Sequence, residues 1–259
     1  FMCDIDNHYQ CKSKKNYTDP WIIIEQYGMD SLRCYLMSSA VMQADDLFFN
    51  DKEVRDVYNK IINTLRNVAE FYKMYAQGVI AAKKDMKFEN ILDRWILSRL
   101  NNLIKESTEQ ADHYNTVKVC RLNKYFIEDL SVWYVRRSRG RFKSQDEGQK
   151  TEACFVLRSV LLTLSKLIAP ILPFISEDIY QALKDKNDME SVHLEDWPKT
   201  SKKLIDKKLE EKMEKVREIV TLALAERAKA GIKVRQPLSK LQITNDPFDF
   251  AQGHGERSR

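Results

Sequence analysis

A stretch of cations flanked by aromatic residues is the feature of this sequence best suited to chemistry with a nucleic acid. Four arginines and one lysine fall between positions 136 and 143, with no acidic residue among them. Cations neutralise phosphates, and aromatic rings offer flat faces on which unpaired bases stack. The residues that we expect to bind RNA are Trp133, Tyr134, Arg136, Arg137, Arg139, Arg141 and Lys143.

A purely structural interpretation of the same stretch stays open. Cations near the C-terminal end of a helix complement the negative end of its dipole, and a tryptophan at Trp133 would then belong to the core. Helical spacing places Arg137 beside Trp133 on one side and beside Tyr134 and Arg141 on the other. Composition alone does not decide between the two interpretations. If the stretch binds RNA, Arg137 is the residue that we expect to contact a base.

A second basic segment, residues 12–20, combines lysines with hydroxyl groups and could hold phosphate. A short basic run is more often a solvated loop. Other chemistries lack their motifs: the sequence has no Gly-x-Gly-x-x-Gly, no Walker loop and no paired-histidine metal site. The five cysteines include no Cys-x-x-Cys pair, so we predict reduced thiols and no metal.

Composition favours helices. The chain has 259 residues, of which 43% are hydrophobic and 31% charged, with only 7 glycines and 6 prolines. A net charge of +5 permits RNA binding without requiring it. No apolar run approaches the roughly 18 residues of a membrane span, and the first residues lack a signal-peptide pattern. We therefore expect a cytoplasmic protein without a membrane partner.

Apolar residues that recur every three or four positions predict amphipathic helices. Asn90 is an expected N-cap, Pro170 an expected stop and Gly231 an expected C-terminal cap. One or two short strands are expected over 232–243. The expected helices cover residues 21–27, 30–39, 51–78, 90–111, 115–142, 151–169, 174–183 and 203–230.

Several motifs, in order along the chain, resemble those of class I aminoacyl-tRNA synthetases. Residues 12–20 resemble the end of the Lys-Met-Ser-Lys-Ser loop with its Asn-Tyr-x-Asp-Pro continuation, and 27–33 resemble the stretch that follows. Residues 93–100, 167–180 and 192–198 resemble later parts of the anticodon-binding bundle. Within the class, residues 129–139 and 230–238 are similar to isoleucyl-tRNA synthetases, although valyl and leucyl enzymes share the architecture.

The resemblance covers about residues 12–243 and implies a mainly α fold: an anticodon-binding helical bundle with a small α-rich linker subdomain and a small C-terminal α+β element. Its parts in chain order are a remnant of the catalytic signature loop (1–15), a linker subdomain that contacts the tRNA stem (16–50), the anticodon-binding bundle (51–185), a C-terminal helix with short strands (186–244) and a disordered tail (245–259).

The resemblance also implies a function for the longer enzyme, which would activate isoleucine with ATP and Mg²⁺ and transfer it to tRNA(Ile). Lys12 and Ser13 match the last two positions of the signature loop and are the expected catalytic residues, with Lys12 contacting the ATP phosphates. The three positions before Lys12 read Tyr9-Gln10-Cys11 where the family has Lys-Met-Ser.

The catalytic half, with its His-x-Gly-His signature, and the editing domain are missing from this sequence. We therefore expect the chain alone to be inactive, to bind no cofactor, and to bind tRNA rather than DNA as a monomer. The alternatives are a non-catalytic tRNA-binding module, the same region of a valyl or leucyl enzyme, and a helical interaction domain without RNA.

Overall fold

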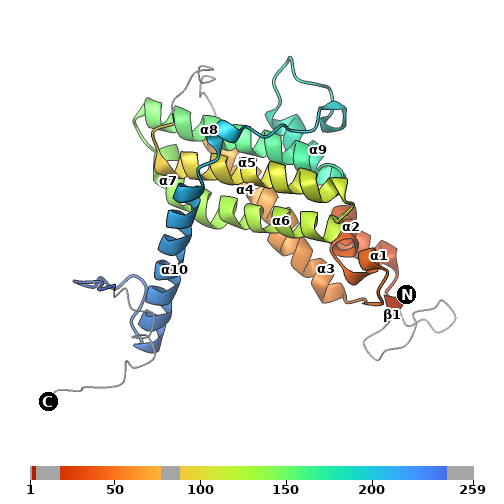
Figure 1. The fold of residues 1–259 in the computed structure, drawn as a ribbon, viewed down its shortest axis with the longest axis horizontal. Coiled ribbons are helices and arrows are strands. Elements are labelled where there is room, and N and C mark those ends of the chain that lie inside the picture. Colours follow the sequence, from red (N-terminus) through yellow and green to blue (C-terminus); the bar gives the residue numbers. More distant parts are fainter. Residues whose placement is uncertain (1, 4–17, 77–87, 244–259) are drawn as a thin grey trace. The chain divides into compact units, whose positions relative to one another are not determined.

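The structure is a computed structural model that describes residues 2–3, 18–76 and 88–243 (Figure 1). The chain divides into two compact units, Phe1–Glu210 and Glu211–Arg259. The expected remnant loop over residues 1–15 lies almost wholly outside the described residues, and the expected tail over 245–259 lies wholly outside them. The boundaries predicted at 50 and 185 fall inside the first unit and remain predictions.

Two short helices open the first unit. They are α1 (Pro20–Tyr27) and α2 (Met29–Met37), close to the helices predicted over 21–27 and 30–39. Gly28 separates them with a φ of +79°, a conformation that glycine adopts without strain. A short parallel pairing joins β1 (Met2–Cys3) to β2 (Leu47–Phe48).

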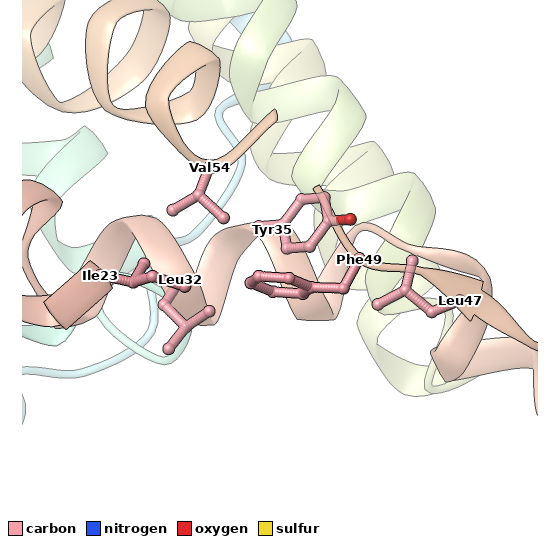
Figure 2. Packing of buried hydrophobic residues seen from close by; sticks show 6 residues of the cluster. All are labelled: Ile23, Leu32, Tyr35, Leu47, Phe49 and Val54. Carbon is pink, nitrogen blue, oxygen red and sulfur yellow. The ribbon is translucent and has the colours of Figure 1, made fainter. Parts of the chain in front are cut away.

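A small hydrophobic cluster holds this N-terminal part to the first long helix (Figure 2). The ring of Tyr35 meets that of Phe49 edge to face, with 5.4 Å between ring centres. Val54, from α3 (Asp51–Val57), is fully buried against them. The cluster consists of Ile23, Leu32, Tyr35, Leu47, Phe49 and Val54.

The helices predicted from residue 51 onward are confirmed, and two of them contain a π-helical turn. The described elements are α3, η3 (Tyr58–Ile62), α4 (Asn63–Ala76), α5 (Ile91–Asp112), α6 (Thr116–Glu128), η4 (Asp129–Val135), α7 (Arg136–Phe142), α8 (Glu147–Ile168) and α9 (Pro173–Leu183). The helix expected over 115–142 is therefore the continuous run α6–η4–α7. Helix α5 packs against both α6 and α8 (Figure 1).

Side-chain caps explain where several helices begin. The Asn90 side chain accepts a hydrogen bond from the backbone N–H of Leu92 at 2.9 Å, as expected for an N-cap. Asp146 caps α8, which therefore starts four residues earlier than the predicted residue 151. Pro173 occupies the first turn of α9, where its missing N–H leaves no intrahelical bond unmade.

Large apolar side chains fill the centre of the bundle. Burying each of them contributes about 1.5–3 kcal/mol relative to exposure, so the packed helices fix the position of every surface residue on them. Fully buried members from α5, α6, η4, α7 and α8 include Trp95, Ile96, Phe126, Leu130, Phe142, Leu157 and Leu161.

The C-terminal segment departs from the prediction in two ways. Helix α10 (Lys207–Lys229) is shorter than the expected 203–230, because Lys202–Leu204 forms a separate 3-10 turn. Gly231, at φ +67°, follows it as predicted. The short strands expected over 232–243 are absent from that described segment. Its carbonyl groups at Lys233, Val234 and Gln236 instead accept hydrogen bonds from Arg227, so no partner strand is needed.

Within the described part of the chain, no helix has both the length and the apolar character needed to cross a membrane.

Candidate nucleic-acid interface

The predicted RNA-binding residues lie on η4 and α7, at the end of the helix that starts at Thr116, with Lys143 as the C-cap of α7. Buried Leu130 and Val135 fix this segment in the bundle core. The Arg99 guanidinium on α5 donates to the carboxylate of Asp129, with 3.1 Å between Nε and Oδ2. The segment is thus positioned by packing and by an ion pair before any ligand is considered.

The inward face of this helix end consists of Tyr134, Ser138 and Phe142, which are all buried. Their spacing of four residues places them on one side of the helix. Phe142 meets the ring of Phe71 edge to face, with 5.0 Å between ring centres. Tyr134, predicted to bind RNA, is therefore a core residue in this structure.

The outward face carries a row of three exposed cations. Arg136, Arg139 and Lys143 follow one another at spacings of three and four, so they lie along the same side of the helix. We call these three residues the cation row. Among the described residues none of the three has an acidic ion-pair partner. Like charges at this spacing repel one another, and a bound anion would relieve that repulsion.

Arg137 and Trp133 form a stacked pair beside the row. The Arg137 guanidinium carbon lies 4.5 Å from the centre of the Trp133 ring, within the range of a cation–π interaction. Arg137 is exposed and Trp133 is half-buried. The sequence interpretation placed these two residues side by side, and the structure brings them together.

Arg141 lies apart from the other cations, because its side chain is turned into the bundle. Its guanidinium binds both oxygens of Asp93, with 2.7 Å for each nitrogen–oxygen contact, and also reaches Glu152 at 3.0 Å. The Tyr134 hydroxyl donates to the same Asp93 carboxylate at 2.7 Å. Asp93 is fully buried and the Arg141 side chain is 11% exposed. Tyr134 and Arg141 are thus structural residues here, which corrects their expected place on the RNA surface.

The pKa shifts of Arg141 and Tyr134 indicate that neither side chain changes its protonation state near neutral pH. Burial alone would lower the pKa of the Arg141 guanidinium, but the hydrogen bonds and charge of Asp93 outweigh burial and raise it. Burial, the charge of Asp93 and its hydrogen bond raise the pKa of Tyr134 well above 10.0. Arg141 therefore stays cationic and Tyr134 stays neutral, each serving as a fixed donor to Asp93.

Sequence reasoning missed Asp93 and Glu152 as partners of this segment. Asp93 lies in the first turn of α5, where an acidic residue interacts well with the helix dipole even without a cationic partner. It lies 48 positions from Arg141, and Glu152 lies 11 positions away, beyond the reach of any local spacing rule. A fully buried aspartate needs a cationic partner, but its burial could not be seen in the sequence.

The predicted catalytic residues, Lys12 and Ser13, lie outside the described residues. Within residues 2–3, 18–76 and 88–243, no group of three or more histidines, cysteines and carboxylates could hold a metal ion.

Comparisons with known proteins identify the family to which this helical bundle belongs. Residues 93–243 match the family described as the anticodon-binding domain of tRNA ligase, and the chain belongs to this family. The expected resemblance to isoleucyl-tRNA synthetases is confirmed. The chain is 42% identical, over 241 residues, to isoleucine–tRNA ligase of Chlamydia trachomatis serovar L2b (strain UCH-1/proctitis), and 41% identical, over 242 residues, to that of Chlamydia muridarum (strain MoPn / Nigg).

These matches cover 92% of this chain but 23% of each relative, so the chain spans about a quarter of their length. Two solved structures share the fold. A leucyl enzyme from Agrobacterium radiobacter K84, in a ternary complex with tRNA and LeuAMS, has a TM-score of 0.59 at 20% identity, over 80% of this chain and 24% of that one. Methionyl-tRNA synthetase of Mycobacterium tuberculosis has a TM-score of 0.55 at 17% identity, over 68% of this chain and 36% of that one.

Proposed function

We propose that this chain is the anticodon-binding region of an isoleucine–tRNA ligase and that its bundle binds the anticodon arm of tRNA(Ile). The observation that carries the proposal is the cation row, whose members have no acidic partner among the described residues, in a chain of this family. The identity of 42% to named isoleucine–tRNA ligases supports the choice of amino acid.

The geometry of the cation row suits a single RNA strand. Lys143 follows Arg136 by seven positions, a distance of about 10 Å along a helix axis. That length lets the row contact more than one phosphate of the same strand. These contacts fix the position of the RNA, and they carry no information about its sequence.

The stacked pair of Arg137 and Trp133 is proposed to contact a base. A ring with a guanidinium over it offers a flat, cationic surface on which an unpaired base of a loop can stack. The Arg137 guanidinium has no hydrogen-bond acceptor among the described residues, so its N–H donors can read a base edge. Phosphate contacts from the cation row would supply affinity, and a base contact from Arg137 and Trp133 would discriminate among tRNAs.

The longer enzyme is proposed to activate isoleucine with ATP and Mg²⁺ in the cytoplasm and to transfer it to tRNA(Ile). Lys12 and Ser13 are proposed to contribute there, with Lys12 contacting the ATP phosphates as the family's signature loop does. We propose a monomer for the chain itself.

Binding of three purified tRNAs to the chain tests the proposal. Filter binding or fluorescence anisotropy at fixed salt should give the highest affinity for tRNA(Ile), with lower affinity for tRNA(Val) and tRNA(Leu). Equal affinity for all three would leave a general tRNA-binding module, and highest affinity for another tRNA would reassign the amino acid. Absence of tRNA binding would contradict the proposal.

A further inference from the structure

Two cysteines far apart in the sequence meet at one pocket. Cys34 on α2 and Cys120 on α6 are both buried, with exposed fractions of 3% and 4%. Both line a cavity of about 310 Å³ between α2, the α3–η3 run and α6. The sequence predicted five separate reduced thiols, so this pairing is new information from the fold.

The two thiols interact with one another. The neighbouring Cys120 thiol, together with burial, raises the pKa of Cys34. Whichever of the two thiols reacts first, the other lines the same cavity and can resolve a mixed disulfide on it.

The walls of the cavity contain further charged groups. Lys124 and Arg121 line it from α6 and favour a negative sulfur, while Glu53 and Asp56 line it from α3. The Asp56 carboxylate is bound to Lys60, with 2.7 Å between oxygen and nitrogen. A small molecule that enters the pocket can therefore reach a thiol that lies near cationic side chains and a second thiol.

Cys154 provides a contrast within the same chain. It is also buried, but it lines none of this cavity, and its thiol points to the backbone carbonyl of Tyr75 at 4.0 Å. Burial raises its pKa. Cys154 therefore lacks both the cavity and the second thiol that Cys34 and Cys120 share, and we expect it to be unreactive.

We propose that Cys34 and Cys120 form a reversible disulfide when the protein meets a small-molecule disulfide. One of the two cysteine thiolates attacks one sulfur of the reagent, releases one thiolate of the reagent and forms a mixed disulfide. The other cysteine then loses its proton and attacks the cysteine sulfur of the mixed disulfide, and the second thiolate of the reagent leaves. Two cysteine thiols are oxidised, and one reagent disulfide is reduced to two thiols.

The expected consequence is a covalent link between α2 and α6. Such a link restricts the unfolded chain, because it closes a long loop, and it raises the melting temperature of the oxidised form. It also fixes the N-terminal helices to the bundle. Reduction by an excess of monothiol would reverse both effects.

Peptide mapping of the full 259-residue chain tests the proposal. The chain is treated with hydroxyethyl disulfide under native conditions, alkylated, digested without reductant and analysed by mass spectrometry. The expected product is a peptide pair joined through Cys34 and Cys120, with Cys154 alkylated. A Cys154→Ser variant should give the same cross-link, and dithiothreitol should remove it.

The Cys34→Ala variant separates the two steps. It should retain a stable mixed disulfide on Cys120, because the second thiol that resolves it is gone. A native chain in which both thiols stay unmodified overturns the proposal, provided that the urea-unfolded chain reacts in the same reagent. A native chain that keeps a mixed disulfide on either of the two cysteines without forming the cross-link overturns it too.

Discussion

Arg141 and Asp93 form a two-point ion pair inside the bundle, with 2.7 Å for each of its nitrogen–oxygen contacts. The pair joins α7 to α5, and Tyr134 and Glu152 complete it from η4 and α8. One cation of the basic stretch is thus used to hold the helix, while the cation row faces outward. The orientation of the row follows from this buried anchor.

Arg141→Met is expected to destabilise the chain. Removal of one partner leaves the Asp93 charge buried and uncompensated, which costs about 3–5 kcal/mol. Urea unfolding followed by circular dichroism measures the loss. At this chain length each kcal/mol lowers the melting temperature by roughly 2–4 °C.

Arg139→Met is the matched control for that substitution. It removes the same charge from an exposed position two residues away, so its effect on stability should stay within about 0.5 kcal/mol. Equal losses for the two variants would contradict the structural assignment of Arg141.

Arg139→Ala is expected to weaken binding of every tRNA by a similar factor. A cation that neutralises one phosphate of a single strand contributes about 0.7 to the slope of log affinity against log salt. The variant should therefore reduce the magnitude of that slope by about 0.7 while leaving the order of preference among tRNAs intact. An unchanged slope would remove Arg139 from the interface.

Arg137→Ala is expected to act on discrimination. A base contact is worth roughly 1–3 kcal/mol, so the variant should lose affinity for tRNA(Ile) more than for tRNA(Val) or tRNA(Leu). Competition binding with the three tRNAs measures the difference. Uniform weakening would make Arg137 a phosphate contact instead. Trp133→Ala is a poorer test, because the half-buried ring also contributes to packing.

Glu195→Gln is expected to reduce the dependence of stability on acidic pH. The Lys166 ammonium lies 2.8 Å from this carboxylate and, with the Tyr180 hydroxyl, lowers the pKa of Glu195 below its ordinary 4.5. A lowered pKa in the folded state means that Glu195 contributes stability above pH 4.5 that is lost as the pH falls through the lowered pKa.

Urea midpoints at neutral pH and near pH 3 measure this effect. The original chain should lose more stability over that interval than the variant, and the variant should already be weaker at neutral pH. Parallel losses in the two proteins would show that the Lys166–Glu195 pair does not contribute.

The chain alone is expected to catalyse no isoleucine-dependent exchange between ATP and pyrophosphate. In a longer enzyme that carries this chain, Lys12→Ala should slow adenylate formation far more than it weakens tRNA binding, because Lys12 matches the phosphate-contacting position of the loop. Exchange by the chain alone would contradict the first expectation. Adenylate formation at the original rate in the variant would contradict the second.

The helices could be predicted because their apolar residues recur at helical spacing, and Asn90 and Pro173 mark beginnings by local chemistry. The inward orientation of the Arg141 side chain could not be predicted, because it depends on Asp93, which lies 48 positions away. The meeting of Cys34 with Cys120 depends in the same way on how α2 packs against α6. Long-range partners of this kind follow from packing, which a local pattern does not encode.

The strands predicted over 232–243 are not formed, for a related reason. Alternating apolar residues there resembled a strand pattern, but a strand needs a neighbour to accept and donate its backbone hydrogen bonds. The described residues offer the side chain of Arg227 instead, which binds three carbonyl groups of the segment. A pattern can suggest a strand without supplying the partner that makes it one.

The most direct test of the account is the salt dependence of tRNA(Ile) binding by the original chain and by the triple variant Arg136→Gln, Arg139→Gln, Lys143→Gln. If the cation row neutralises three phosphates, the slope of log affinity against log salt should be about −2 or steeper for the original chain. The magnitude of the slope should be smaller by about 2 for the variant. The melting temperature of the variant should stay unchanged. A variant that folds normally and binds tRNA(Ile) with the original affinity and slope would contradict the account.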